Sequence, residues 1–386
     1  MITAETQALL EPLERFESIR RSVARLGDRL CDFSYANPYE GAVGAAREVI
    51  ARTLQDERSL DLQYAPFGGQ PLARRACAEA LRGSHGADFT AADVVLTPGA
   101  MAALQLALRV SAVPGGNVVI PSPCWLDHPL YARALGLEPR LVPLAEPGFG
   151  LDCAAIVGAV GPQTCAVVLT QPNNPTGRCH TRAELIRLGD ELRAAQERHG
   201  CRITLIADEV HRDFVPADYA SAADHFERTI IVYSFGKYHF MQGQRLGYAA
   251  VSPEHPERER TAQELVRWTR IAGIATPTAL MQRALPRLLA LRHEHARLDP
   301  LRRCLIESLR AAGYELSEPD GTLFLYVRTP SAHEDDFAFV QALAQRGVLV
   351  LPAPVFHHRG WFRLSLTASL EMVARALPVL AELGPR

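Results

Sequence analysis

The chain has 386 residues, 48% of them hydrophobic, which is enough to bury one large core and a smaller second one. Its formal net charge is −2 with acidic and basic residues interspersed, which disfavours binding to nucleic acid or an anionic membrane and favours small-molecule partners. The eight cysteines are scattered, with no C-x-x-C pair and no grouping with histidine, so neither a metal site nor a disulfide framework is indicated.

The N-terminal segment carries charged residues at helical spacing and contains no apolar stretch typical of a secretion signal. No later stretch has the length of a membrane span. With no sign of paired cysteines, these features predict a cytoplasmic protein with reduced thiols.

The middle of the chain alternates short apolar runs with longer helical patterns. The runs read "DVVLTPG", "NVVIPSP", "CAVVLTQP", "ITLIADEV" and "TIIVYSF". This alternation predicts an α/β fold with a mainly parallel sheet covered by helices on both faces. Ligands of such sheets bind beyond the carboxyl ends of the strands, where the polar stretches "TPGA", "PSPCW", "TQPNNPTG", "ADEVH" and "SFGK" fall.

After about residue 280 the pattern changes to a long helix rich in Arg and Leu, followed by "GTLFLYVRT", another helix, "GVLVLPA" and "WFRLSLTA". This order predicts a smaller α+β domain that the N-terminal segment completes. The predicted boundaries are 1–45 for the N-terminal segment that joins the small domain, 46–280 for the large domain and 281–386 for the small domain.

Lys237 is the only lysine in a chain with 41 lysine and arginine residues. Arginine keeps its proton at physiological pH, whereas a lysine amine can lose its proton in a suitable environment and attack a carbonyl. Lys237 is therefore a candidate nucleophile, with a surface lysine that survived codon bias as the alternative.

Other strand-end residues indicate a bound cofactor. Asp208 ends an apolar run, where a carboxylate is costly unless it meets a cation such as a protonated ring nitrogen, although an acid that caps a turn would look the same. Gly99, Ala100 and Met101 open a helix whose free N–H groups suit a phosphate. Asn174 could orient a ligand's oxygens or simply belong to a tight loop.

Taken in order, and with Lys237 following Ser234 as S-x-x-K, these stretches resemble the fold-type I pyridoxal-phosphate enzymes, specifically the class I and II aminotransferases. The similarity runs from "DFSYANP" at 32–38 to "FRLSL" at 362–366. It implies a large domain with a mainly parallel seven-stranded sheet flanked by helices, and a smaller α+β domain built from the two termini. It also implies pyridoxal 5′-phosphate as the cofactor.

The resemblance implies roles around the cofactor ring. Lys237 would form the Schiff base and then move the proton between the substrate Cα and the cofactor C4′. Asp208 would pair with the protonated pyridine nitrogen. Asn174 would donate to the 3′ oxygen and touch the substrate carboxylate. Trp125 would stack on the ring and face the substrate, although a lone strand-end tryptophan is more often a core residue.

The resemblance also implies a phosphate site. It would be formed by the helix that begins after Gly99, through the backbone amides of Ala100 and Met101, together with Ser234 and Arg245. A bidentate arginine is well suited to a phosphate dianion.

Three further residues would complete the site by resemblance. Tyr64 matches a tyrosine that reaches the phosphate of the neighbouring subunit, which implies a homodimer with shared active sites. Arg363 matches the arginine that binds the substrate α-carboxylate. Ala36 takes the place of a backbone contact to that carboxylate, where glycine is usual.

The chain departs from the family pattern in two places beside the expected reacting centre. His211 stands where a tyrosine usually donates to the cofactor's 3′ oxygen, and an imidazole titrates near neutrality. His239 and Phe240 follow the lysine where small or hydroxylic residues are common.

These observations predict an aminotransferase that moves an amino group between an L-α-amino acid and a 2-oxo acid by a ping-pong mechanism. The alternative is elimination, replacement or carbon–carbon bond formation with the same cofactor, which His211 and His239 motivate. A regulator with an aminotransferase-like domain would need a DNA-binding module, and none is expected before residue 32. The sequence identifies no second cation for the substrate side chain.

Overall fold

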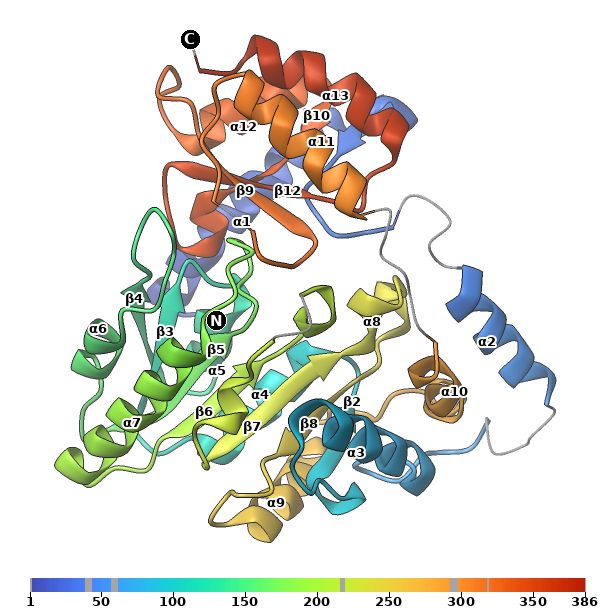
Figure 1. Ribbon diagram of the computed structural model, residues 1–386, viewed down its shortest axis with the longest axis vertical. Helices are drawn as coiled ribbons and strands as arrows, with labels where there is room; N and C mark the ends of the chain where they lie inside the picture. Colours follow the sequence, from blue (N-terminus) through green and yellow to red (C-terminus); the bar gives the residue numbers. More distant parts are fainter. Residues whose placement is uncertain are drawn as a thin grey trace.

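The computed structural model describes residues 2–38, 44–56, 62–215, 219–291, 298–317 and 319–385. Its centre is a seven-stranded sheet with the order β2-β8-β7-β6-β5-β3-β4 (Figure 1). The strands are β2 (Val94–Thr97), β3 (Asn117–Ser122), β4 (Glu138–Pro143), β5 (Thr164–Thr170), β6 (Thr204–Asp208), β7 (Thr229–Ser234) and β8 (Gly247–Val251). Only β8 runs antiparallel to its neighbours β2 and β7, so the predicted mainly parallel seven-stranded sheet is confirmed.

Helices cover both faces of this sheet. Successive strand residues point to opposite faces, and apolar side chains on each face pack against helices. Val118 and Ile120 of β3 pack toward α4 (Ala100–Ser111), α5 (Asp127–Ala134) and α9 (Arg258–Ile271). Val119, between them, packs toward the opposite face. That face is covered by α3 (Pro71–His85), α6 (Cys153–Gly158), α7 (Arg182–His199) and α10 (Ala279–Leu289). Both faces are therefore buried, as the continuous apolar runs predict.

Helix α7 shows how local sequence sets the ends of these crossover helices. Thr181 and Glu184 form a capping box at its start, and Gly200 ends it in the left-handed conformation with φ of 63°. Both features satisfy backbone groups that the terminal turns leave without helical partners.

The two ends of the chain form one smaller α+β unit, as predicted (Figure 1). A three-stranded antiparallel sheet has the order β11-β12-β9, and β1 pairs in parallel with β10. The elements are α1 (Ala4–Val23), β1 (Cys31–Asp32), α11 (Leu298–Ala311), β9 (Phe324–Arg328), α12 (Asp336–Gln345), β10 (Val348–Leu349), β11 (Leu351–Pro352), β12 (Trp361–Ser365) and α13 (Leu370–Glu382). Phe16 and Phe33 share one apolar cluster with Phe339 and Val373, which ties the termini together.

The boundaries at 45 and 280 stay predictions. Helix α10, which begins beside the second boundary, packs on α3 and on α2 (Gly44–Gln55) of the large unit. Among the described residues, no helix is both long and apolar enough to cross a membrane.

The register of the parallel strands aligns their polar ends. Thr170 at the end of β5 is the pairing partner of Asp208 at the end of β6. Asp208 in turn pairs with Val232 of β7, which ends two residues later at Ser234. These polar strand ends converge because the carboxyl ends of parallel strands share one edge of the sheet.

Candidate active site

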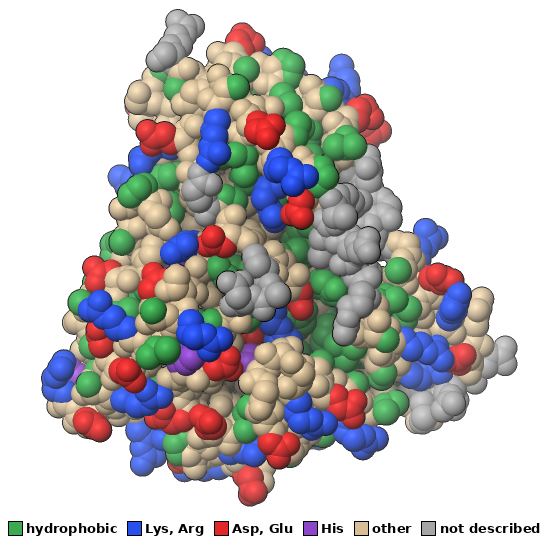
Figure 2. Space-filling model, viewed as in Figure 1, with side chains coloured by type: hydrophobic (Ala, Val, Ile, Leu, Met, Phe, Trp, Pro, Cys, Tyr) green, Lys and Arg blue, Asp and Glu red, His purple; other side chains and the backbone are tan. Residues whose placement is uncertain are grey.

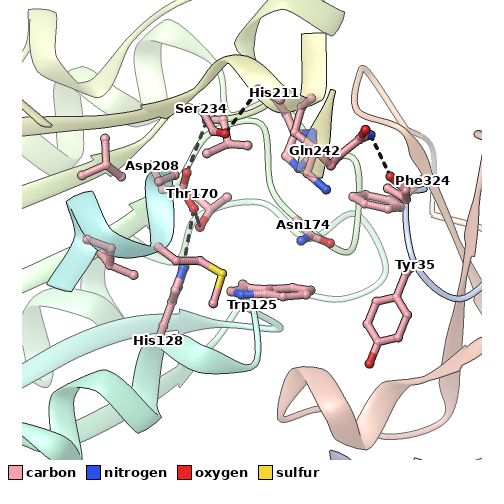
Figure 3. Close-up of a pocket in the computed structure, with 18 of the residues that line it drawn as sticks. Tyr35, Trp125, His128, Thr170, Asn174, Asp208, His211, Ser234, Gln242 and Phe324 are labelled. Carbon is pink, nitrogen blue, oxygen red and sulfur yellow. Dashed lines mark hydrogen bonds and ion pairs between the residues drawn. The ribbon is translucent and has the colours of Figure 1, made fainter. Parts of the chain in front are cut away.

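An open cavity with an empty volume of about 1070 Å³ lies at this edge of the sheet, between the strand ends and residues of β9 and β12. Figure 3 shows Trp125, Asn174, Asp208 and His211 around it. The predicted site residues that line it are Ala36, Ala100, Met101, Trp125, Asn174, Asp208, His211, Ser234, Lys237, Arg245 and Arg363.

Lys237 lies on the short helix α8 (Phe235–Tyr238), which Ser234 caps by accepting a hydrogen bond from the Gly236 amide. Burial lowers the pKa of Lys237 to about 8, assisted by the charges of Arg363 and Arg245 and opposed by Asp208. At that pKa roughly a tenth of the amine is neutral at pH 7. An arginine here would remain charged, so a neutral nucleophilic amine at this position requires lysine.

Asp208 is held from three sides. Its Oδ1 accepts the Val210 amide at 3.3 Å, and its Oδ2 lies 3.5 Å from both the Thr170 hydroxyl and His128 Nε2 (Figure 3). Neither Thr170 nor His128 is among the site residues predicted from the sequence. Thr170 follows from the strand register, whereas only the orientation of α5 brings His128, three residues after Trp125, to the carboxylate.

Arg363 on β12 is 1% exposed. It donates through Nη1 to Asn174 Oδ1 at 2.8 Å and through Nη2 to the Ser34 carbonyl at 2.7 Å. Burial lowers the pKa of this guanidinium well below its usual value, with partial compensation from Tyr35 and Tyr326.

No carboxylate in the described parts of the chain forms an ion pair with Arg363, and its buried Nε has no hydrogen-bond partner there. Aromatic rings lie around the guanidinium instead, with Cζ 3.8 Å from the ring centre of Phe324 and 5.9 Å from that of Trp125. A buried cation without a counter-ion is suited to bind an anion from outside the chain.

The start of α4 lies directly against Arg245. Gly99 has a φ of 89°, and a Cβ there would lie 2.7 Å from Arg245 Nη2, so glycine allows the guanidinium to approach the helix end. Ala100 and Met101 begin the helix, and Ser234 ends β7 beside them in the cavity wall. Free amide groups, a hydroxyl and a guanidinium converge, as a phosphate dianion requires.

His211 is buried at the end of the loop after β6. Its ring packs against Phe324 at 5.4 Å and Phe214 at 6.2 Å between ring centres, and Nδ1 has no partner among the described residues. Burial, followed by the charges of Lys237 and Arg363, lowers its pKa well below the usual value. The expectation of titration near neutrality is therefore wrong, and His211 is a neutral imidazole with an unused nitrogen.

The other departures lie away from the cavity. Neither His239 nor Phe240 lines it: His239 packs against Phe235 and Tyr238, and Phe240 is buried against Phe214. The expectation that they flank the reacting centre is wrong: both residues follow the end of α8 at Tyr238, and their rings pack against other aromatic side chains instead. Tyr64 is fully exposed and does not line the cavity of its own chain.

The fold and the site together define a fold-type I transferase, with a buried lysine, a strand-end carboxylate and two arginines around one cavity. The sequence model of the family described as "Aminotransferase class I and II" matches residues 33–380. The chain belongs to this family.

Individual proteins agree with that assignment. The aspartate/prephenate aminotransferase of Thermus thermophilus is 30% identical over 86% of this chain and 85% of its own length. The aspartate aminotransferase of Thermococcus kodakarensis is 28% identical over 87% and 84%. The crystal structure of an amino transferase from Eubacterium rectale has a TM-score of 0.88 at 25% identity and covers 99% of this chain and 98% of its own.

Proposed function

We propose that this aminotransferase uses pyridoxal 5′-phosphate to move an amino group between an L-α-amino acid and a 2-oxo acid in two half-reactions. The observation that carries the proposal is the environment of Lys237. Its amine is buried, its pKa is lowered to about 8, and it faces a cavity that also contains Asp208 and two arginines.

The residues present fit this cofactor. The start of α4, Ser234 and Arg245 would hold the phosphate, since the side-chain-free Gly99 leaves the helix end open to the guanidinium. Asp208 would pair with the ring nitrogen, and Trp125 would cover one face of the ring. The neutral imidazole of His211, with its unpaired nitrogen, would donate to the ring oxygen in place of a tyrosine.

When bound, the cofactor supplies an aldehyde and a ring that withdraws electrons from the substrate Cα. Lys237 would hold that aldehyde through its neutral amine. Once the substrate amino group has replaced Lys237 at the aldehyde, the free Nζ would accept the proton from the substrate Cα. It would then deliver this proton to the cofactor C4′. Asp208, held by His128, would keep the ring nitrogen protonated.

Arg363 would orient the substrate through its α-carboxylate. Because Asn174 uses its carbonyl oxygen to accept from Arg363, its amide nitrogen is left to donate to the bound ligands. The backbone at Ala36 lies beside this pair, since the carbonyl of Ser34 binds the other end of the guanidinium. These contacts would align the Cα–H bond with Lys237.

The proposal includes a homodimer with shared active sites, located in the cytoplasm. Tyr64 is fully exposed, and Leu62, Phe67 and Leu72 near it expose large apolar side chains, which supports contact with a second chain. On the face shown in Figure 2, acidic and basic side chains are interspersed, which agrees with small-molecule substrates.

Stopped-flow absorbance with the cofactor-loaded protein tests the function. An L-amino acid should convert the cofactor to its amine form and release the matching 2-oxo acid, and a second 2-oxo acid should restore the starting spectrum. Release of ammonia, or of a product with a changed carbon skeleton, would instead support elimination or bond formation with the same cofactor.

A further inference from the structure

Trp125, which lines the cavity (Figure 3), is the residue that the proposed function places over the cofactor ring. Its indole Nε1 donates a hydrogen bond to Asp127 Oδ2 at 3.1 Å, and the Tyr131 hydroxyl donates to the same oxygen at 3.2 Å. Asp127 is the first residue of α5, so the indole is tied to the start of this helix. The place of the ring in the cavity therefore depends on what holds the segment 122–127.

The stretch between β11 and β12 of the smaller unit holds this segment through its backbone. The Ser122 hydroxyl donates to the His357 carbonyl at 2.9 Å, and the Cys124 amide donates to the Phe356 carbonyl at 3.2 Å. Ser122, Cys124 and Phe356 are buried, so water does not compete for these bonds. Both bonds fix the part of the segment that precedes Trp125.

The His357 side chain adds a contact on the other side of Trp125. Its Nε2 lies 3.2 Å from the Leu126 carbonyl, and because a carbonyl can only accept, Nε2 must carry the proton. Burial lowers the pKa of His357, the hydrogen bond to Leu126 opposes this shift, and the charge of His128 adds to it. The imidazole is therefore a neutral hydrogen-bond donor at physiological pH.

The backbone of His357 is in the left-handed region, with φ of 58° and ψ of 39°. Glycine adopts this conformation freely, whereas a residue with a Cβ adopts it at an energetic cost. Here the conformation directs both the carbonyl and the imidazole of His357 toward the segment 122–127. A strained position whose side chain makes a specific contact indicates that the contact serves a function.

The same stretch lies beside the residue that would bind the substrate carboxylate. The Phe356 ring centre is 4.9 Å from Arg363 Cζ and 6.4 Å from the centre of the Trp125 ring. His358 Nδ1 lies 2.9 Å from the hydroxyl of Tyr326, which is the strand partner of Arg363. The stretch between β11 and β12 therefore connects Arg363 with Trp125.

We propose that His357 is a positioning residue whose hydrogen bond to the Leu126 carbonyl holds Trp125 in place over the cofactor and at a fixed distance from Arg363. This inference rests on the proposed function, because the two side chains would contact the cofactor ring and the substrate carboxylate. Without the bond, the segment 122–127 is held to this stretch only ahead of Trp125. The cover of the ring and the spacing to Arg363 then both loosen.

An isosteric pair of variants tests this proposal in the cofactor-loaded protein. His357→Gln and His357→Met share the backbone strain and the side-chain length, but only glutamine can donate a hydrogen bond. His357→Met should reduce the visible circular dichroism of the bound cofactor and raise the half-saturating amino acid concentration roughly 5-fold, the effect of one lost hydrogen bond. His357→Gln should keep both within about 2-fold of wild type. Equal behaviour of the two variants would overturn the proposal.

Two controls separate positioning from general contact between the two units. Glu146→Ala removes other contacts between them, with His358 at 2.9 Å and Arg328 at 3.2 Å, and should leave the circular dichroism unchanged. In a Trp125→Phe background, His357→Met should have little further effect, because its action passes through Trp125. The same loss in Glu146→Ala, or fully additive effects in the double variant, would show that His357 does not position Trp125.

The two proposals fail differently, since circular dichroism of the bound cofactor requires no turnover. If the signal changes in His357→Met but not in His357→Gln while no amino acid converts the cofactor, amino transfer is wrong and the positioning role stands. If amino acids react in the wild type and both variants match it, amino transfer stands and the positioning role is wrong.

Discussion

At the position of Lys237, burial and two neighbouring cations lower the pKa of the amine to about 8, so that a usable fraction of it is neutral at physiological pH. Lys237→Arg should therefore fold with its cation retained but lose amino transfer by several orders of magnitude, because a guanidinium supplies no nucleophile at neutral pH. Borohydride reduction of the wild-type holoenzyme followed by peptide mapping should tag Lys237. A tag on any other residue, the N-terminal amine included, would contradict the assignment.

Arg363 is the second residue whose environment suits a ligand, because it is a buried cation without a carboxylate partner among the described residues. Arg363→Ala should weaken binding of an amino acid or of 3-phenylpropionate by roughly 2–5 kcal/mol, the scale of a lost charged hydrogen-bond pair. Arg363→Lys keeps the charge without the two-pronged geometry and should recover only part of that loss. Calorimetry measures both variants, and unchanged affinity together with altered dimerisation would show a structural role.

His211 tests how a neutral donor affects the cofactor. A hydrogen bond to the ring oxygen favours the charged form of that oxygen and lowers the pKa of the bound chromophore. His211→Phe should therefore retain the cofactor and raise that pKa, whereas His211→Tyr should lower it again. Because burial keeps His211 itself neutral, the wild-type absorbance titration should show a single transition. Superimposable curves for wild type and His211→Phe would mean that the imidazole does not contact the ring.

At the scale of elements, a buried ionic network connects the end of β6 to α3. Glu209, next to Asp208, is fully buried and accepts from Arg212 Nη1 at 3.0 Å and from the Ser221 hydroxyl. His85 at the end of α3 lies 3.5 Å from Glu209 and 3.0 Å from Asp224. The network holds the segment that directly follows Asp208 in place.

This network should make stability depend on pH. Burial lowers the pKa of His85, but the charge of Glu209 and hydrogen bonds with Asp224 and Glu209 outweigh it and raise the pKa to about 9. A raised pKa means that the protonated form stabilises the fold. The contribution, roughly 3 kcal/mol, should be complete below about pH 6.5 and disappear as pH rises through 9.

Urea unfolding of wild type and His85→Gln between pH 6 and 10 measures this contribution. The difference between the two proteins isolates His85 from Lys237, whose lowered pKa makes stability rise with pH in the same interval. The difference should shrink as pH rises through 9, and a constant difference would show that His85 does not carry the charge.

The elements also show how far sequence reasoning reaches. The apolar runs predicted the strands, and because parallel strands end at one edge, they also predicted that Asp208 and Ser234 lie near Lys237. The directions of side chains could not be predicted from the sequence in the same way. His128 reaches Asp208 only through the orientation of α5, and His239 does not line the cavity. Such contacts depend on packing between elements, which no local pattern encodes.

For the whole molecule, the open question is whether one chain makes a complete active site. Tyr64 is fully exposed on its own chain and lies outside that chain's cavity, yet the family resemblance gives it a role at the phosphate of a neighbouring chain. Tyr64→Ala should then weaken cofactor binding although the residue touches no site of its own subunit. Tyr64→Phe, which removes only the hydroxyl, should reproduce most of this loss.

Complementation between two inactive variants tests the shared site. In a mixed dimer of Lys237→Ala and Tyr64→Ala chains, one site carries both changes and the other carries neither. Random exchange of subunits at limiting cofactor should therefore restore about a quarter of the wild-type sites, whereas each variant alone stays inactive or weak. Sedimentation velocity should show a dimer throughout. A dimeric mixture that recovers no activity would place Tyr64 away from the neighbouring phosphate, and a monomeric wild type would refute the shared site altogether.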